Sequence, residues 1–172
     1  MNTVKITSGK WRGQILATPG GATHPMGARE KLALFNIISE YLPGAKVLDA
    51  FAGSGALGIE ALSRGAEKVV FIERNTAAVR VIRQNLAKVG AFGDVFAGKV
   101  RDFESADNFE VILADPPYDD FNVKEVAGLE KWLTNGGVLI LSHPGAAPEI
   151  AGLKLEKTHQ YAAAHLSVYS KH

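Results

Sequence analysis

The pattern of hydrophobic and polar residues changes its period along the chain. From residue 45 onward, short continuous runs rich in Val, Ile and Leu alternate with longer stretches in which apolar residues recur every three or four positions. Continuous apolar runs are typical of strands buried on both faces, and the wider period is typical of amphipathic helices. The alternation predicts an α/β fold in which helices cover both faces of a mostly parallel sheet.

The expected elements can be assigned in chain order. Strands are predicted at 46–51, 68–73, 94–98, 109–115 and 137–143, and helices at 55–65, 76–90 and 121–133. Asn75 is the expected N-cap of the second of these helices, and Gly90 its stop. The last two apolar runs, 153–161 and 164–171, lie too close together for a crossover helix, so we expect them to pair antiparallel.

The first 27 residues follow a different pattern. Apolar and polar residues alternate around Gly9 and Gly13, which predicts a β-hairpin with a Lys-Trp-Arg tip, followed by a loop and an amphipathic helix at 28–41. We therefore expect a hairpin extension (1–27) on a single larger domain (28–172). Five basic residues and one acid lie in the first 34 residues of a chain whose net charge is +1. This asymmetry favours a surface that faces a polyanion.

Composition excludes several classes of protein. The chain has no cysteine, so disulfides and thiolate metal sites are excluded, and its five histidines have no spacing typical of metal ligands. No apolar run approaches the ~20 residues that span a bilayer, and the first residues lack the apolar segment of a secretory signal. We expect a cytoplasmic protein without a metal.

A glycine-rich loop follows the first strand of the larger domain. Gly53, Gly55 and Gly58 fit the G-x-G-x-x-G pattern between a strand and a helix, and Glu73 ends the next strand twenty residues after Gly53. Such a loop lets a ligand approach the backbone, and the acid can accept hydrogen bonds from ribose hydroxyls. The pattern predicts an adenosine-containing ligand, with a plain strand–turn–helix as the alternative.

The residues before Gly53 help to identify the adenosine-containing ligand. Asp49 closes the strand, and three residues separate it from Gly53. A carboxylate there would repel the pyrophosphate of a nicotinamide cofactor, but it suits a ligand that carries a sulfonium and an ammonium group. S-adenosylmethionine is the favoured ligand, and a nicotinamide-dependent oxidoreductase remains the alternative.

The second candidate site is the sequence Ala-Asp-Pro-Pro-Tyr at 114–118. It ends the fourth strand of the larger domain, whose carboxyl end is expected beside the glycine loop. The rigid turn would hold the Asp115 carboxylate and the Pro116 carbonyl as two acceptors, with Pro117 behind them, and Tyr118 offers a flat face for stacking. This set suits the methylation of an exocyclic amine on an unpaired or flipped-out base. A rigid turn without a catalytic role is the alternative.

These motifs resemble a known family. The sequences VLDAFAGSGALGIEALSRGA, VVFIERN and ADPPY resemble class I S-adenosylmethionine-dependent methyltransferases, and GKWRG followed by LFNII resembles the RsmD-type 16S rRNA guanine-N2 methyltransferases. The resemblance implies a Rossmann-like fold, with a mostly parallel seven-stranded sheet, an antiparallel last strand and an N-terminal β-hairpin. It also implies a monomer that methylates N2 of a guanosine in 16S rRNA or in a small-subunit assembly particle.

The resemblance also implies roles for individual residues. The methyl donor would be held by Asp49, Phe51, Ala52, Gly53, Ser54, Gly55, Glu73, Arg74 and Asp102. The target amine would be held by Asp115, Pro116, Pro117 and Tyr118. RNA would be contacted by Lys5, Lys10, Trp11, Arg12, Arg29 and Lys31.

The chain departs from the family pattern at several positions. His24, Ala28 and Leu32 replace an Arg, an Asp and a Glu, and Ser142-His143 stands where the family tends to carry an acid. These departures concern substrate recognition more than the chemistry. Because the same loop serves several amines, adenine N6 or a glutamine amide is an alternative target, although Asp rather than Asn at position 115 disfavours the glutamine amide. A non-catalytic RNA-binding protein is a further alternative.

Overall fold

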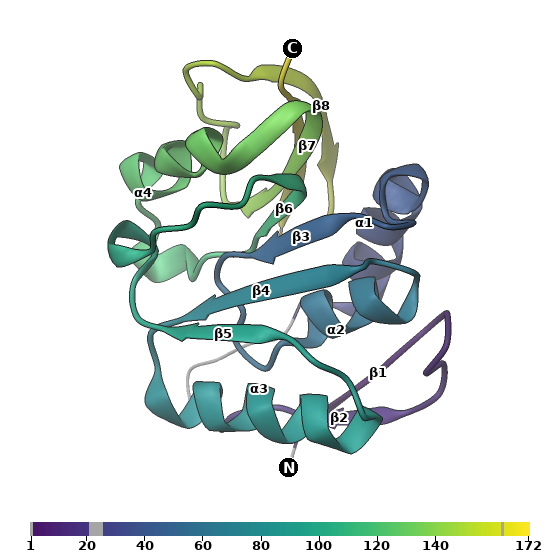
Figure 1. The fold of residues 1–172 in the computed structure, drawn as a ribbon. Helices are drawn as coiled ribbons and strands as arrows, with labels where there is room; N and C mark the ends of the chain where they lie inside the picture. Colours follow the sequence, from purple (N-terminus) through teal and green to yellow (C-terminus); the bar gives the residue numbers. More distant parts are fainter. Residues whose placement is uncertain (1, 21–25, 163) are drawn as a thin grey trace.

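The computed structural model describes residues 2–20, 26–162 and 164–172. Most of the chain surrounds one sheet of seven strands in the order β5-β4-β3-β6-β7-β9-β8 (Figure 1). These strands are β3 (Lys46–Asp49), β4 (Lys68–Glu73), β5 (Asp94–Ala97), β6 (Phe109–Ala114), β7 (Leu133–His143), β8 (Lys154–Gln160) and β9 (His165–Ser170). The first five run parallel, and β9 pairs antiparallel with β7 and with β8. The predicted fold class is thereby confirmed.

Helices cover both faces of this sheet. The α-helices are α1 (Ala28–Ile38), α2 (Ala56–Ser63), α3 (Thr76–Val89) and α4 (Val123–Ala127), and 3-10 turns occur at η1 (Ser39–Tyr41), η2 (Val100–Asp102), η3 (Tyr118–Asp120) and η4 (Gly128–Trp132). As predicted, Asn75 caps α3 by accepting a hydrogen bond from the Ala78 amide, and Gly90 ends it with a positive φ.

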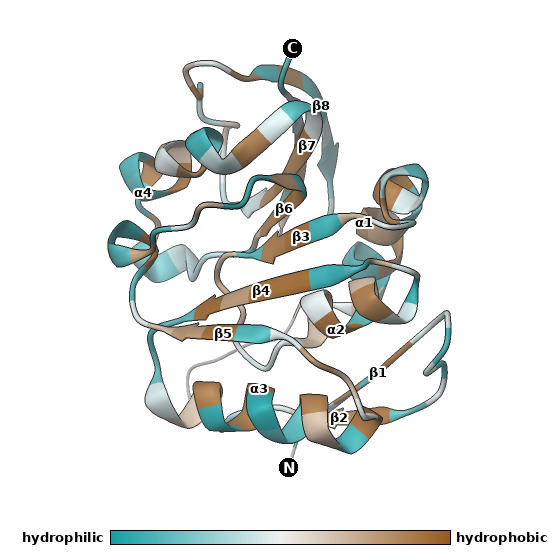
Figure 2. Cartoon of the chain, in the orientation of Figure 1, coloured by the Kyte–Doolittle hydropathy of each residue, from teal (hydrophilic) through white to brown (hydrophobic). Residues whose placement is uncertain are grey.

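Two hydrophobic cores follow from the alternation of strand side chains. Val47 belongs to the core that also contains residues of α1, α2 and α3, whereas Leu48 belongs to the core on the other face, with Val126 of α4 and Trp132. Figure 2 shows the central strands largely hydrophobic and α3 alternating between the two kinds of residue. The sheet is thus buried on both faces, as its continuous apolar runs predict.

The N-terminal hairpin forms a separate two-stranded sheet. Its strands, β1 (Thr3–Lys5) and β2 (Ile15–Ala17), pair antiparallel beside α2 and α3 (Figure 1). Ile6 and Leu16 are fully buried in the core that contains α2. The hairpin is therefore packed onto the domain rather than projecting from it.

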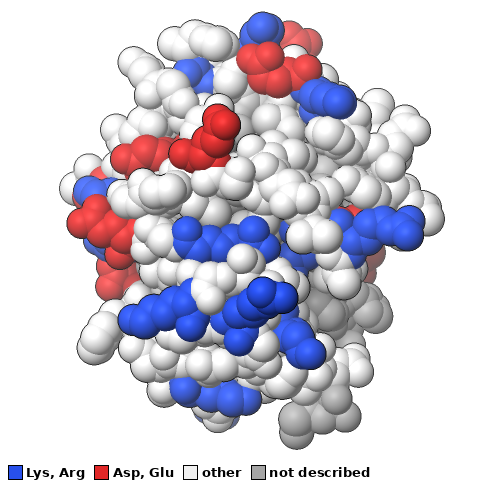
Figure 3. Space-filling model, turned by 90° about the vertical axis from the view of Figure 1, so that its right-hand side faces the viewer, with Lys and Arg blue, Asp and Glu red and all other residues white. Residues whose placement is uncertain are grey.

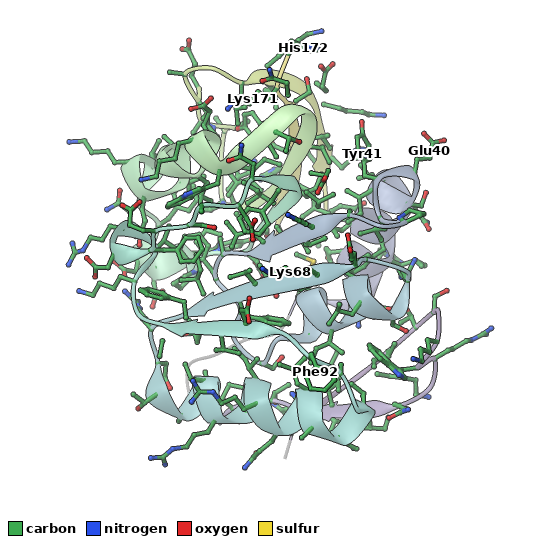
Figure 4. All side chains as sticks on the ribbon, viewed as in Figure 1. Glu40, Tyr41, Lys68, Phe92, Lys171 and His172 are labelled. Carbon is green, nitrogen blue, oxygen red and sulfur yellow. The ribbon has the colours of Figure 1, made fainter. Side chains whose placement is uncertain are left out.

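The predicted helix at 121–133 is wrong in its second half. The α-helix ends at Ala127, a 3-10 turn follows, and β7 begins at Leu133, which pairs with Phe109. Residues 134–137 belong to this strand because the Gly136 amide donates to the Lys171 carbonyl at 2.6 Å. Lys171, labelled in Figure 4, also forms an ion pair with Glu130 at 2.8 Å. These contacts come from residues distant in the sequence, so local periodicity misses them.

Among the described residues, no helix combines the length and the apolar character needed to cross a membrane.

Candidate active site

The two candidate loops meet at the carboxyl edge of the sheet. Strands β3 and β6 are parallel neighbours, with Asp49 opposite Leu113 in their register. The Ala50 amide donates to the Leu113 carbonyl at 2.9 Å, which continues the pairing to the point where both loops begin. The glycine loop and the Asp-Pro-Pro-Tyr turn therefore face one crevice, as the sequence predicts.

The glycine loop is a tight turn into α2. Gly53 and Gly55 have φ angles of 55° and 80°, in the left-handed region that favours glycine. Gly58 lies against the sheet, where an added Cβ would come within 2.3 Å of Cε1 of Phe71. The first two glycines allow the turn, and the third allows close packing of the helix on the strand.

Asp49 is fully buried beneath this loop. Its Oδ2 accepts a hydrogen bond from the Gly58 amide at 2.9 Å, whereas its Oδ1 has no partner among the described residues. Burial raises the pKa of Asp49 to about 7, against the lowering effect of the Gly58 bond and with added repulsion from Asp115 and Glu73. The carboxyl is thus poorly satisfied and lies close to two other acids.

Glu73 supports the glycine loop from the end of β4. Its Oε2 accepts from the Gly53 amide at 2.7 Å, and its Oε1 accepts from the Asn75 amide at 2.9 Å. Each carboxylate oxygen keeps a further lone pair for another donor. The next residue, Arg74, forms an exposed ion pair of 2.9 Å with Asp120, which links the β4 loop to the turn after Tyr118.

The crevice is lined by residues of the larger domain and of the N-terminal part of the chain. Its lining residues are Phe51, Ala52, Gly53, Ser54, Ala56, Leu57 and Asp115 from the domain, and Val4, Thr18, Pro19, Met26 and Lys31 from the N-terminal part. Asp49 lies beneath this lining. Asp102 is exposed on η2, after β5, and does not line the crevice.

The Asp-Pro-Pro-Tyr turn presents one acid to the crevice. Asp115 is half-buried, Pro116 is buried, and Tyr118 is 36% exposed on η3. Burial raises the pKa of Asp115 to about 6, although a hydrogen bond from Ser142 lowers it. The Asp115 carboxyl lines the crevice and can accept hydrogen bonds there.

Ser142 is a site residue to which the sequence assigns no role. It lies on β7, next to β6, and its Oγ is 2.5 Å from the Tyr118 hydroxyl oxygen. The sequence marks Ser142 only as a departure from the family pattern. Ser142 and Tyr118 are 24 residues apart in the sequence, and the pairing of β7 with β6 brings them together. No local sequence signal could reveal this contact.

The buried Glu60 of α2 attaches the hairpin. It accepts hydrogen bonds from the Thr7 amide at 2.9 Å and the Ser8 amide at 3.2 Å, and it forms ion pairs with Lys31 and Arg64. Neither Glu60 nor its hydrogen-bonded partners stand out in the sequence, because an acid on a helix is usually exposed. Glu60 thus holds the hairpin against the helix that follows the glycine loop.

This attachment does not support the RNA-contact prediction for Lys31. Its side chain is 3% exposed, and its Nζ lies 3.0 Å from Glu60 and donates to the Lys5 carbonyl at 2.9 Å. The amphipathic spacing of α1 does not specify whether Lys31 is exposed or buried. Its ion pair with the buried Glu60 of α2 places it inside. Lys31 joins the hairpin to the crevice wall.

The other predicted RNA contacts lie near the surface. Lys5, Lys10, Arg12 and Arg29 are exposed, and Figure 3 shows Lys and Arg side chains gathered in a band across the face on the right of Figure 1. Trp11 is half-buried against the core, with Lys10 Nζ 5.6 Å from its ring centroid. The hairpin tip is docked, because the Lys10 amide donates to the Ser63 carbonyl at 2.8 Å. His24 lies outside the described residues.

The sheet order and the two loops at its carboxyl edge define the fold of a class I methyltransferase. The chain matches the family model described as "Conserved hypothetical protein 95" over residues 4–170, and it belongs to that family.

Relatives and solved structures extend this match. YlbH of Bacillus subtilis is 31% identical over 182 residues, covering 98% of this chain and 99% of the relative. The Ribosomal RNA small subunit methyltransferase D of Haemophilus influenzae is 36% identical over 132 residues, covering 72% of this chain and 68% of the relative. The solved structure of yhhF from Escherichia coli superposes with a TM-score of 0.86 at 28% identity, covering 99% of this chain and 98% of that one.

Proposed function

We propose that the protein transfers a methyl group from S-adenosylmethionine to N2 of a guanosine in small-subunit rRNA. The observation that carries this proposal is the half-buried Asp115 at the rim of the glycine-loop crevice, on a turn stiffened by two prolines. Membership of the family and the relative named Ribosomal RNA small subunit methyltransferase D support the choice of substrate.

The residues of the crevice fit the donor. Asp115 lines the crevice, Asp49 is buried beneath the glycine loop and is repelled by both Asp115 and Glu73, and one oxygen of Asp49 lacks a partner among the described residues. A ligand with sulfonium and ammonium charges relieves the repulsion among these groups, whereas a pyrophosphate would add to it. When bound, the donor supplies a methyl group on a positively charged sulfur.

Several residues are assigned to the donor in this proposal. Glu73 accepts hydrogen bonds from the ribose hydroxyls through its free lone pairs, and the loop residues Phe51, Ala52, Gly53, Ser54 and Gly55 surround the ligand. Asp49 acts from beneath the loop through its charge and its bond to Gly58. Asp102 and Arg74 lie outside the crevice lining, at the ends of the neighbouring strands, and are assigned to its adenosine end.

The target amine is assigned to the Asp-Pro-Pro-Tyr turn. The Asp115 carboxylate and the Pro116 carbonyl accept the two amine protons, which favours the pyramidal nitrogen of the reaction and stabilises the positive charge that develops on it. Pro117 keeps the turn rigid, and Tyr118 stacks on the base. The base has to be unpaired or flipped out to reach this site.

RNA binding is assigned to the hairpin extension, residues 1–27, and to the start of α1. Lys5, Lys10, Arg12 and Arg29 contribute exposed positive charge, and Trp11 adds a partly exposed aromatic ring. Residues 28–172 carry the catalytic domain. We assign 16S rRNA or a small-subunit particle as substrate, a monomer as the active form and the cytoplasm as its location.

Modification mapping tests the proposal directly. rRNA from cells with and without the gene is digested and its methylated nucleotides are located by mass spectrometry. We expect one N2-methylguanosine in small-subunit rRNA to disappear with the gene and to return when the gene is restored. Loss of an N6-methyladenosine would change the assigned amine, and an unaltered rRNA would overturn the proposal.

A further inference from the structure

Asn85 is a buried amide that lies between the N-terminal hairpin and the glycine loop. It belongs to α3 and is 2% exposed. Its Oδ1 accepts a hydrogen bond from the Ala17 amide at 2.9 Å, and its Nδ2 donates to the Ala17 carbonyl at 2.9 Å and to the Ser54 carbonyl at 3.0 Å. A side-chain amide has two N–H donors, and both are used here. One side chain thus joins β2 to the glycine loop.

The neighbours of Asn85 specify which way its amide faces. The Thr18 amide donates to the Asn2 carbonyl across the hairpin at 3.3 Å, so the amide and carbonyl of the preceding Ala17 point away from β1. They form the outer edge of the two-stranded sheet, and Asn85 bonds both groups as a neighbouring strand would. Because the Ala17 amide needs an acceptor and the two carbonyls need donors, this orientation of Asn85 satisfies all three.

The two segments that Asn85 joins are both walls of the crevice. Ser54 lines it from the glycine loop, and Thr18 and Pro19 line it from the segment after β2. Three hydrogen bonds from one short side chain can form together only at one separation of these segments. Asn85 therefore sets the distance between two walls of the crevice.

We propose that Asn85 is a positioning residue that couples the glycine loop to the hairpin, so that a donor bound in the crevice stiffens the hairpin assigned to RNA. The inference rests on the proposed function, because it needs a donor in the crevice and RNA on the hairpin. A donor that contacts the glycine loop restricts the Ser54 carbonyl, which holds the Asn85 amide in the orientation that bonds Ala17. Opening of the hairpin away from α3 breaks the two bonds to Ala17, so a restricted Asn85 disfavours this opening.

Ser63 offers a matched control on the other side of the hairpin. It belongs to α2 and is 4% exposed, and its Oγ accepts from the Trp11 amide at 3.0 Å and donates to the Ser8 carbonyl at 2.7 Å. Like Asn85, it attaches the hairpin through two backbone groups, but these bonds do not involve the glycine loop. Ser63→Ala should therefore loosen the hairpin without breaking its link to the loop.

Amide hydrogen exchange of the free protein measures the coupling. The Ile6 amide donates to the Gln14 carbonyl at 2.9 Å, and the Gly13 amide donates to the Ile6 carbonyl at 2.8 Å. Both amides report opening of the hairpin, because two strands alone are not stable apart from the domain. In the unchanged protein we expect saturating S-adenosylhomocysteine to slow exchange at both amides about fivefold. In Asn85→Leu, which nearly keeps the size of the side chain and removes its three bonds, the ligand should slow exchange less than about 1.5-fold.

The control separates coupling from a merely structural role. Ser63→Ala should exchange faster than the unchanged protein and still respond about fivefold to the ligand, because a lost attachment changes the opening equilibrium and not its dependence on the ligand. Asn85→Ala is measured alongside, so that the test stands if the leucine prevents folding. Equal responses in the Asn85 variant and in Ser63→Ala would overturn the inference, because the donor would then act on the hairpin directly through Thr18 and Pro19. An unchanged protein that binds the ligand without any response would overturn it as well.

The reciprocal effect is measured with RNA. A transcript of small-subunit rRNA should bind the unchanged protein and Ser63→Ala about threefold more tightly with saturating S-adenosylhomocysteine than without it, because coupling between two sites is mutual. Asn85→Leu should bind the transcript equally in both conditions. A transcript affinity that the ligand raises as much in Asn85→Leu would overturn the coupling. An unchanged protein that binds neither the ligand nor the transcript would instead overturn the proposed function.

Discussion

Two carboxyl groups in the described part of the chain are fully buried, and their pKa values move in opposite directions. Asp49, at the end of β3, has its pKa raised to about 7, first by burial and then by repulsion from Asp115 and Glu73. Glu60, in the middle of α2, has its pKa lowered, because hydrogen bonds from Thr7 and the charge of Lys31 outweigh the effect of burial. Asp49 lies at the carboxyl edge of the sheet, and Glu60 attaches the hairpin.

The difference lies in how completely each carboxylate is satisfied. Glu60 receives hydrogen bonds from two backbone amides, one hydroxyl and two cationic side chains. Asp49 has one bond to the Gly58 amide, and its other oxygen is unpaired among the described residues. A satisfied buried acid stabilises the fold, whereas an unsatisfied one reduces stability, and Asp49 fits the proposed donor because a positively charged ligand would compensate its charge.

The largest expected effect concerns the carboxyl edge of the sheet. Asp115→Ala removes the acceptor proposed for the amine, so we expect the rate of methyl transfer to fall by a factor on the order of 1,000. Affinity for S-adenosylhomocysteine, measured by calorimetry, should change less than about threefold because the glycine loop is untouched. Asp119→Ala, in the same turn but exposed, is the control and should keep its activity. Full turnover in Asp115→Ala would contradict the assigned role.

At the hairpin attachment, by contrast, we expect a substitution to lower the stability of the fold. Glu60→Ala leaves Lys31 buried without its carboxylate, and we expect the free energy of unfolding in urea to fall by about 3 kcal/mol. The loss should shrink at acid pH, because a carboxyl with a lowered folded-state pKa loses its contribution as pH falls through that pKa.

A double-mutant cycle separates the ion pair from the other bonds of Glu60. Lys31→Met and Glu60→Ala are measured alone and together. Because both partners of the pair are then absent, the double variant should be more stable than the sum of the two losses predicts. Strict additivity would show that Lys31 and Glu60 do not stabilise one another.

Asp49 should have the opposite dependence on pH. Its folded-state pKa of about 7 lies above the ordinary value of 3.8, so the folded protein binds its proton more tightly than the unfolded chain does. The contribution of Asp49 to stability therefore falls as pH rises from about 4 to 7. Asp49→Asn removes this dependence, and we expect its stability relative to the unchanged protein to rise by on the order of 2 kcal/mol between pH 5 and 8.

Urea unfolding at several pH values checks this expectation. A difference between Asp49→Asn and the unchanged protein that stays constant from pH 5 to 8 would contradict a raised pKa of Asp49.

The smallest expected effect concerns the basic surface of the hairpin. Lys10→Ala with Arg12→Ala should weaken RNA binding about tenfold and reduce the slope of log affinity against log salt by about 2, because two phosphate contacts are lost. The matched control is Lys154→Ala with Lys157→Ala, which removes two exposed charges from β8. Equal losses in the two double variants would show a general charge effect and no specific role for the hairpin.

Local features were predictable from the sequence alone. The alternation of apolar runs and helical periods specified most elements, and Asn75 and Gly90 specified the ends of α3, because caps and periods depend on neighbours within a few residues. The glycine loop and the Asp-Pro-Pro-Tyr turn could be placed at one edge of the sheet, because the carboxyl ends of neighbouring parallel strands meet there. The sequence thereby determined the class of fold and the candidate chemistry.

Tertiary structure decided which polar groups meet. The burial of Lys31 against Glu60 and the contact of Ser142 with Tyr118 join residues on different elements. The packing of these elements also leaves one oxygen of Asp49 without a partner among the described residues. A serine on a strand or a lysine on a helix has no sequence signal that specifies its partner, because hydrogen bonds between distant elements depend on their packing. Local patterns could therefore identify the two loops as candidate functional sites. Only the fold shows that Asp49 lies beneath the glycine loop and that Glu60 attaches the hairpin.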